Sequence, residues 1–250
     1  MSKRFEGKTA LLTGAASGIG KATAVKLAAE GAAVVVADLH EQAAQAVVAD
    51  ITGAGGKAVA FGGDFTSPAV NEAAVAFAVE KFGALHLAFN NAGIIGPQGP
   101  VHQVDLDGYK KLMGINLDAV FYGLKYQIPA MLAAGGGSIV NTASILGLVG
   151  TAGYAPYVTA KHAVAGLTKS AALQYSSKGI RINSVHPGYI DTPLLNELSR
   201  EEYNALVALH PIGRLGTSED VANVVAFLLS DEAAFVSGSQ YTVDGGYTAQ

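Results

Sequence analysis

Residues 9–20 of the chain read Thr9-Ala10-Leu11-Leu12-Thr13-Gly14-Ala15-Ala16-Ser17-Gly18-Ile19-Gly20. The apolar run at the start predicts a buried strand, and the small residues after it predict a tight turn that opens a helix. In such a turn, backbone N–H groups can approach a pyrophosphate, whose negative charge the N-terminus of the helix favours. The glycine spacing is G-x-x-x-G-x-G rather than G-x-G-x-x-G, and glycine-rich turns also occur without a ligand. The stretch therefore indicates a dinucleotide-binding turn but does not establish one by itself.

The alternation of short apolar runs with longer alanine-rich stretches continues along the whole chain. Seven strands are expected, at residues 9–12, 33–37, 58–61, 85–89, 138–141, 180–185 and 239–243. Six helices are expected between them, at about 18–30, 41–53, 68–82, 105–133, 154–177 and 218–230. Because continuous apolar strands alternate with helices, the sheet should be parallel and covered on both faces. The sequence thus predicts one α/β domain over residues 1–250, a Rossmann fold with a doubly wound, seven-stranded parallel sheet.

Composition excludes several classes of site and partner. The 250 residues include no cysteine, which excludes disulfides and thiolate metal sites, and the six histidines lack metal-ligand spacing, so we expect no metal. The formal net charge is -4, with 16 Lys and Arg against 20 Asp and Glu, which argues against a nucleic-acid partner. No apolar run approaches the roughly 20 residues that span a membrane, and we expect a cytoplasmic protein with no membrane partner.

A carboxylate stands at the end of the second expected strand. Asp38 lies 18 residues after Gly20, close to the spacing at which an acidic side chain meets the ribose of a dinucleotide. Its carboxylate can accept hydrogen bonds from both ribose hydroxyls and would repel a 2′-phosphate. No Lys or Arg occurs beside it, where Leu39 and His40 follow, or within residues 15–17. The sequence therefore favours NAD over NADP.

A tyrosine and a lysine lie four residues apart in Tyr157-Val158-Thr159-Ala160-Lys161, which puts both side chains on one face of a helix. An adjacent ammonium stabilises a phenolate and should lower the pKa of Tyr157 toward the range that an acid–base catalyst needs. Tyr154 is the competing phenol, but it lies seven residues from Lys161. Ser144 follows the fifth expected strand and could donate a hydrogen bond to a substrate oxygen. Each of these residues alone also fits a surface or turn position, so the hypothesis depends on their combination.

Together these motifs resemble the short-chain dehydrogenase/reductase family in its compact form. The matching residues occur in the family's order, and they are Thr13-Gly14-x-x-x-Gly18-Ile19-Gly20, Asp38, Asp64, Asn90-Asn91-Ala92-Gly93, Asn116, Ser144, Tyr157-x-x-x-Lys161, Asn183, Pro187-Gly188 and Thr192. The resemblance implies that Tyr157 is the catalytic acid–base and that Lys161 supports it at the nicotinamide ribose. It also implies that Ser144 orients the substrate oxygen and that Asn116 holds a water that relays protons.

The resemblance further implies where a cofactor would lie. The residues expected at the pyrophosphate are Gly14, Ser17, Gly18, Ile19 and Gly20. Asp38 is expected at the adenosine ribose, Asp64 and Phe65 at the adenine, and Asn91 along the cofactor. The residues expected around the nicotinamide are Tyr157, Lys161, Pro187, Gly188, Ile190 and Thr192. The implied reaction is reversible hydride transfer between the carbinol carbon of a substrate and C4 of the nicotinamide.

The substrate side of the pocket is expected to be mostly apolar. Its walls should come from Ile94, Ile95, Ile145, Leu146, residues 151–154, Tyr189 and the segment 190–212, which we expect to act as a lid. A clamp for a carboxylate or phosphate is expected to use Arg, and this segment offers only Arg200 and His210 as cationic groups. The sequence therefore favours an uncharged, fairly apolar secondary alcohol or ketone, and it resembles bacterial dehydrogenases of cyclic alcohols and diols.

The sequence is less consistent with two alternative functions. The first alternative is a 3-oxoacyl-thioester reductase that uses NADPH, against which Asp38 and the net charge of -4 argue. The second is a non-catalytic NAD-sensing scaffold, against which the complete set of Asn116, Ser144, Tyr157 and Lys161 argues.

The helices expected at 105–133 and 154–177 carry more apolar surface than one sheet face covers. With the family resemblance, this surface implies a homotetramer or a dimer.

Overall fold

A parallel sheet forms the centre of the molecule. The structure, a computed structural model, describes residues 3–192 and 199–249. Within these ranges seven strands pair in parallel in the order β3-β2-β1-β4-β5-β6-β7. The strands are β1 (Thr9–Thr13), β2 (Ala33–Asp38), β3 (Lys57–Gly62), β4 (Leu87–Asn90), β5 (Gly137–Thr142), β6 (Ile180–Pro187) and β7 (Gln240–Val243). The expected Rossmann-type sheet is confirmed.

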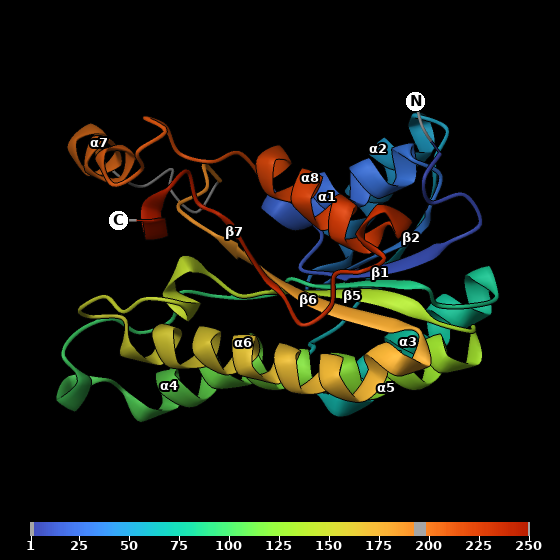
Figure 1. Cartoon of the computed structure of the whole chain (residues 1–250), viewed down its shortest axis with the longest axis horizontal. Coiled ribbons are helices and arrows are strands. Elements are labelled where there is room, and N and C mark those ends of the chain that lie inside the picture. The colour runs from blue at the N-terminus through green and yellow to red at the C-terminus, as the bar shows by residue number, and fades with distance from the viewer. Residues whose placement is uncertain (1–2, 193–198, 250) are drawn as a thin grey trace.

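Helices cover both faces of this sheet (Figure 1). One face carries α1 (Gly18–Ala29), α2 (Glu41–Gly53) and α8 (Ser218–Leu229). The other face carries α3 (Pro68–Phe82), α4 (Leu106–Met113), α5 (Ala119–Ala133) and α6 (Ala155–Tyr175). A further helix, α7 (Arg200–Ala208), lies at one end of the sheet, at the upper left of the figure. None of the helices in the described ranges combines the length and apolarity that crossing a bilayer requires.

The central strands are apolar because both of their faces are buried. In β1, Ala10 and Leu12 pack in the cluster beneath α1, α2 and α8, whereas Leu11 packs in the cluster on the opposite face. Successive side chains of a strand point to opposite faces, so a strand covered on both sides needs an unbroken apolar run. This requirement explains why the strands could be recognised from the sequence.

Two helical features differ from the expectation. The single helix expected over 105–133 is divided by a π-helical segment, Gly114–Asp118, between α4 and α5. Such segments often occur at functional positions, and this one carries Asn116. The second feature is α7, where no helix was expected. The sequence does contain a capping box, in which Ser199 and Glu202 bond reciprocally. However, no side chain of α7 is buried, so the helix lacks the apolar periodicity by which helices were predicted.

The sheet order places a crevice at the carboxyl ends of the strands. β1 pairs with β2 on one side and with β4 on the other, so the chain changes direction across the sheet beside β1. Loops that leave neighbouring strands at such a point diverge to opposite faces, and ligands of open α/β sheets bind between them.

Candidate active site

A cavity of about 780 Å³ opens at the carboxyl edge of the sheet. The segments that leave β1 to β6 each contribute to its wall, through residues that include Gly14, Asp38, Gly63, Asn91, Thr142 and Pro187. The predicted site residues that line it are Gly14, Ser17, Gly18, Ile19, Asp38, Asp64, Phe65, Asn91, Ser144, Tyr157, Lys161, Pro187, Gly188, Ile190 and Thr192. Gly20 and Asn116 lie just behind the wall. The structure thus brings the two ends of the expected site together in one cavity.

The turn between β1 and α1 is packed too closely for side chains at two of its glycines. A Cβ on Gly20 would collide with the carbonyl oxygen of Gly14, and a Cβ on Gly14 would lie 2.8 Å from Cα of Ala92. Gly14 and Gly18 have φ values of +59° and +51°, a region that favours glycine. The side chain of Ser17 at the N-cap of α1 makes no capping hydrogen bond. The first turn of α1 therefore presents open donors to the cavity, as a pyrophosphate requires.

Asp38 faces the cavity with its carboxylate held by two backbone donors. Its Oδ2 accepts from the N–H of Ala16 at 3.1 Å and its Oδ1 from the N–H of His40 at 3.2 Å. Because each carboxylate oxygen has a further lone pair, the group can still accept the hydroxyls of a ribose. Farther along this wall, Oδ1 of Asp64 accepts from the N–H of Thr66 at 2.9 Å, and the neighbouring Phe65 is buried. This end of the cavity fits an adenosine.

Asn91 connects the two halves of the site. Its side-chain amide donates to the carbonyl oxygens of Thr13 at 3.3 Å and Gly14 at 3.0 Å, and its Oδ1 accepts from the hydroxyl of Thr142 at 3.2 Å. The preceding residue, Asn90, points away from the cavity into a buried cluster, where it bonds to Asn141 and Gln127. Asn91 therefore lines the cavity while its side chain fixes the glycine turn against β5.

Lys161 and Tyr157 share one face of α6, as the four-residue spacing predicts. Lys161 is buried, and its Nζ lies 2.9 Å from the carbonyl oxygen of Thr142 and 5.6 Å from the ring centroid of Tyr157. Burial lowers the pKa of Lys161 to about 8, because a charged amine loses its hydration there. Tyr154, the competing phenol, also lines the cavity and occupies the N-cap position of α6, where its side chain makes no capping hydrogen bond.

The direction of the Tyr157 pKa shift differs from the expectation. Burial raises the pKa of Tyr157, the hydroxyl of Ser144 lowers it, and the net shift is upward. The predicted net lowering of the Tyr157 pKa by Lys161 is therefore wrong. The reason is physical: desolvation disfavours the phenolate, and it also disfavours the charged form of the neighbouring amine. Since this pKa lies above its ordinary value of 10, Tyr157 is a protonated phenol at neutral pH.

Ser144 begins the short 3-10 turn Ile145–Gly147. Its Oγ accepts from the N–H of Leu146 at 3.1 Å, and its carbonyl oxygen accepts from the N–H of Gly147 at 2.8 Å. The hydroxyl proton is not used in these contacts. Ser144 can therefore donate this proton either to the oxygen of Tyr157, whose pKa it lowers, or to a substrate oxygen in the cavity.

Asn116 lies behind the wall, next to Lys161. Its amide bonds reciprocally with the backbone of Ile94, with Oδ1 and Nδ2 each at 2.8 Å from their partners. A Cβ built on Gly93 would lie 3.4 Å from Oδ1 of Asn116 and 3.6 Å from Nζ of Lys161. The backbone of Gly93 therefore lies in contact range of both the amide of Asn116 and the ammonium of Lys161. The expected role of Asn116 in holding a water stays a prediction.

The segment after β6 closes the far side of the cavity. A Cβ on Gly188 would lie 2.8 Å from Nε2 of His210, and Ile190 forms an isolated parallel bridge with Gly216. Thr192 approaches the glycine turn, since a Cβ on Gly18 would lie 3.5 Å from its Cγ2. The expected lid, 190–212, includes residues 193–198, which lie outside the described residues.

Sequence reasoning missed two residues at this site. The carbonyl oxygen of Thr142 accepts a hydrogen bond from Nζ of Lys161. The position of Thr142 at the end of β5 could have indicated that it lies at the site. His186, which no sequence motif assigned to the site, contacts Ser144 from behind. No motif marks this histidine, because its role depends on the register between β5 and β6.

A protein-family model described as "Enoyl-(Acyl carrier protein) reductase" matches residues 14–248. A curated relative, the cyclohexanol dehydrogenase of Acinetobacter sp. (strain SE19), is 58% identical over 250 residues, covering 100% of this chain and 98% of that protein. The chain belongs to the short-chain dehydrogenase/reductase family. The protein is therefore an oxidoreductase, and members of this family use NAD or NADP.

Two further comparisons agree with this assignment. The cis-4-hydroxycyclohexanecarboxylate dehydrogenase of Sinomonas cyclohexanicum is 45% identical over 249 residues and covers 100% of both chains. A crystal structure of levodione reductase superposes with a TM-score of 0.93 at 38% identity, covering 98% of this chain and 99% of that one. The short-chain dehydrogenase/reductase fold thus extends over the whole described chain.

Proposed function

We propose that this short-chain dehydrogenase/reductase transfers hydride reversibly between NAD(H) and an uncharged, cyclic secondary alcohol or ketone. One observation carries the proposal: Ser144, Tyr157 and Lys161 line the same cavity as the glycine turn and Asp38. A nicotinamide dinucleotide that lies along this cavity would extend from a site that fits adenosine to a site that can move a proton. Both requirements of an alcohol dehydrogenase are thereby present in one enclosure.

The residues of the chain supply position and proton transfer. NAD, when bound, supplies the hydride acceptor at C4 of its nicotinamide ring. In alcohol oxidation, the carbinol carbon loses a hydride, the phenolate of Tyr157 accepts the hydroxyl proton, and the C–O bond becomes a carbonyl. Ser144 donates a hydrogen bond to the same oxygen. The positive charges of Lys161 and of the oxidised nicotinamide ring, when NAD is bound, would oppose the effect of burial and favour the phenolate. In ketone reduction, Tyr157 returns the proton.

The preference for NAD rests on Asp38. Its carboxylate is held by Ala16 and His40 at the adenosine end of the cavity, and no Lys or Arg stands beside it. A 2′-phosphate placed there would meet a negative charge without a cation to offset it. NAD presents two hydroxyls instead, which the carboxylate can accept.

The substrate class follows from the cavity wall. Near Ser144 and Tyr157 the wall consists of apolar and aromatic side chains, namely Ile94, Ile95, Ile145, Leu146, Tyr154 and Tyr189. Among the described lining residues, Lys161 is the only Lys or Arg, and its Nζ is bonded to Thr142. A cyclic alcohol fills such a wall, whereas a carboxylate on the ring would lack a cationic partner. The names of the relatives, among them cyclohexanol dehydrogenase, support a cyclic substrate.

A substrate panel tests this proposal. The purified protein is assayed for NADH or NADPH formation with cyclohexanol, cyclohexane diols and cis-4-hydroxycyclohexanecarboxylate, and for cofactor consumption with a 3-oxoacyl thioester. We expect turnover of the uncharged ring alcohols with NAD and poor turnover of the carboxylate. Selective NADPH-dependent reduction of the thioester would favour the activity that the family description suggests. Cofactor binding without turnover of any substrate would favour a sensing role.

We also propose that the protein is a homo-oligomer, a tetramer or a dimer, formed through α5 and α6. The exposed side chains on these helices include Phe121, Leu132 and Leu173, which are 53%, 40% and 86% exposed. Large apolar side chains on two adjacent helices are typical of a surface that a second subunit covers. Light scattering of the wild type and of the Leu173→Glu variant tests this: we expect a multiple of the 25.4 kDa chain that the variant weakens, and a wild-type monomer would contradict it.

A further inference from the structure

A buried histidine lies directly behind Ser144. His186 is 0% exposed and stands one residue before the end of β6. Its Nδ1 lies 2.8 Å from the carbonyl oxygen of Ser144, and its Nε2 lies 2.9 Å from Oγ of Ser184. The register between β5 and β6 places it there, since the N–H of Ala143 bonds to the carbonyl of Val185. Both ring nitrogens are therefore engaged.

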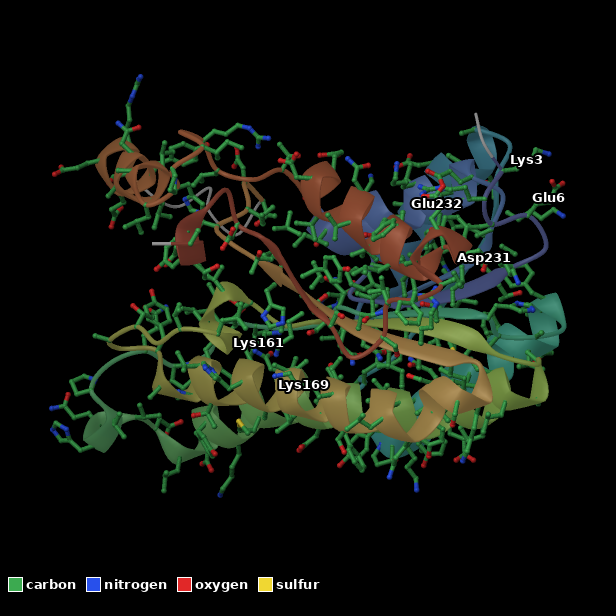
Figure 2. The ribbon with its side chains drawn as sticks, in the orientation of Figure 1. Lys3, Glu6, Lys161, Lys169, Asp231 and Glu232 are labelled. Atoms are coloured by element: carbon green, nitrogen blue, oxygen red, sulfur yellow. The ribbon has the colours of Figure 1, made fainter. Side chains whose placement is uncertain are left out.

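These contacts determine the tautomer of His186. A carbonyl oxygen only accepts, so Nδ1 must carry the proton that it shares with Ser144, and Nε2 of the neutral ring then accepts from the hydroxyl of Ser184. Burial lowers the pKa of His186 to about 4, and the positive charges of Lys161 and Lys169 contribute to the same direction. Figure 2 shows both lysines on α6. His186 is thus a neutral, single-tautomer donor at neutral pH.

The bond from His186 completes the fixation of Ser144. The serine carbonyl accepts from both Gly147 and His186, and the serine Oγ accepts from Leu146. The surroundings leave little freedom, because a Cβ on Gly147 would lie 2.8 Å from the carbonyl oxygen of Lys161 and 3.5 Å from Cε1 of His186. With the backbone and Oγ held in this way, the serine hydroxyl stays beside Tyr157, and its proton is free to be donated on the cavity side.

We propose that His186 is a positioning residue of the reaction, which acts through its Nδ1–H bond to the Ser144 carbonyl to hold the serine hydroxyl toward the substrate oxygen. The inference rests on the proposed function, in which Ser144 binds that oxygen. His186 does not touch the cavity, so its effect reaches the substrate only through Ser144. Misplacement of such a group by a fraction of an ångström is enough to slow a reaction without affecting cofactor binding.

Two substitutions separate the two bonds of the ring. In His186→Asn, the amide nitrogen can occupy the place of Nδ1 and still donate to Ser144, while the contact with Ser184 is lost. In His186→Gln, the amide reaches the place of Nε2 and can bond Ser184, while the contact with Ser144 is lost. Both replacements are polar amides in the same buried site, so each controls for the packing change of the other. Ser184→Ala is the further control for the bond that the proposal treats as unimportant.

We expect His186→Gln to lower kcat about 10- to 100-fold and His186→Asn to stay within about threefold of the wild type. Ser184→Ala should resemble His186→Asn, and NADH affinity, measured by NADH fluorescence, should be unchanged in all three. Equal losses of kcat in the Asn and Gln variants, or losses that follow their melting temperatures, would overturn the proposal.

A double-mutant cycle distinguishes an effect of His186 through Ser144 from a general disturbance of the structure. If His186 acts through the serine hydroxyl, His186→Gln costs activity in the wild type but nothing further in a Ser144→Ala background. Independent, multiplying losses would overturn the inference. Full activity of Ser144→Ala alone would instead contradict the proposed function of Ser144, so the two failures are distinguishable.

Discussion

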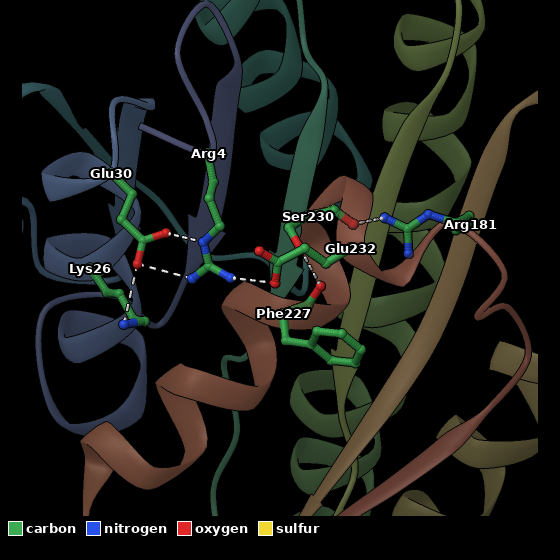
Figure 3. Close-up of polar contacts among 7 residues, drawn as sticks. All are labelled: Arg4, Lys26, Glu30, Arg181, Phe227, Ser230 and Glu232. Carbon is green, nitrogen blue, oxygen red and sulfur yellow. Dashed lines mark hydrogen bonds and ion pairs between the residues drawn. The ribbon is translucent and has the colours of Figure 1, made fainter. Parts of the chain in front are cut away.

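Arg4 and Lys161 are cations at opposite edges of the sheet, and they differ in whether a carboxylate neutralises their charge. Arg4 precedes β1, and its guanidinium bonds Glu30 at 2.6 and 3.0 Å and Glu232 at 3.1 Å (Figure 3). Lys161 lies at the carboxyl edge, where the carbonyl oxygen of Thr142 is its hydrogen-bond acceptor. Within residues 3–192 and 199–249, no carboxylate forms an ion pair with Lys161. One cation is matched to counter-charges and the other is not.

The pKa values record this difference. The hydrogen bonds that Arg4 donates to Glu30 are the largest cause that raises the pKa of Arg4, whereas burial lowers the pKa of Lys161 from 10.5 to about 8. At about 1.4 kcal/mol per pKa unit, keeping Lys161 charged at pH 7 costs on the order of 3 kcal/mol of folding free energy. Ion pairs such as those of Arg4 usually serve the stability of a fold. A buried charge without a counter-charge, such as that of Lys161, is more typical of a functional site.

The largest effect on activity is expected at the phenol beside the unpaired cation. Tyr157→Phe removes the hydroxyl that we propose carries the proton, so kcat should fall about 10²- to 10⁴-fold. Because the ring remains, NADH affinity should change little, as NADH fluorescence would measure. Tyr154→Phe, a phenol of the same cavity, is the matched control and should retain most of the activity. Comparable turnover in Tyr157→Phe would show that another group moves the proton.

Lys161→Met separates function from stability. It should lower kcat about 10²-fold or more, because the phenolate loses its supporting charge. It should not lower the free energy of unfolding at pH 7, since removing the buried charge offsets the lost bond to Thr142. Activity assays and urea unfolding measure the two effects. A variant that is both inactive and strongly destabilised would contradict the view of Lys161 as a costly functional charge.

The same variant has an expected pH dependence. Between about pH 8 and 10.5 the unfolded chain holds the Lys161 proton more tightly than the folded chain, so folding is favoured as pH rises through this window. The stability of the wild type relative to Lys161→Met should therefore increase from pH 8 to 10. A stability difference that does not depend on pH would contradict the shift.

Asp38→Asn sharpens the comparison at the cofactor end. Asparagine keeps an acceptor for the N–H groups of Ala16 or His40 but removes the negative charge. We expect the preference for NAD over NADP, measured as a ratio of kcat/KM values, to fall about 10-fold. A ratio that is unchanged, or a wild type that already prefers NADP, would contradict the role given to Asp38.

The smallest effect is expected at the paired cation. Arg4→Met should leave kcat and KM unchanged and destabilise the fold by about 1–2 kcal/mol, because Glu30 keeps Lys26 at 3.2 Å as a partner. Urea unfolding and steady-state kinetics test this. A loss of activity that exceeds the loss of folded protein would link the two edges of the sheet and break the comparison.

The sequence was most informative about features that depend on neighbouring residues in the chain, such as strands and short motifs. The strands were predictable because burial on both faces demands unbroken apolar runs, as in Ala10-Leu11-Leu12. Asp38 and Ser144 line the site because parallel strands bring their carboxyl ends to one edge, and Tyr157 and Lys161 join them from one face of α6. These predictions needed only the alternation of strands and helices and the spacing of motifs.

Other features depend on contacts between distant segments. Adjacent residues Asn90 and Asn91 point to different surroundings, a buried cluster and the cavity, which their identity does not distinguish. The upward shift of the Tyr157 pKa arises from burial by the folded chain, so a four-residue spacing from Lys161 could not reveal its sign. The contact of His186 with Ser144 likewise exists only once β5 and β6 are in register.

A direct titration of Lys161 tests the account most closely. Isotope-labelled lysine in the wild-type protein, with Lys161→Met used to assign the signal, gives the pKa of this ammonium group by NMR. An unpaired cation held in a buried catalytic site should titrate near 8. A value near the ordinary 10.5 would mean that Lys161 is solvated or paired, and the proposed distinction between structural and functional charge in this protein would be wrong.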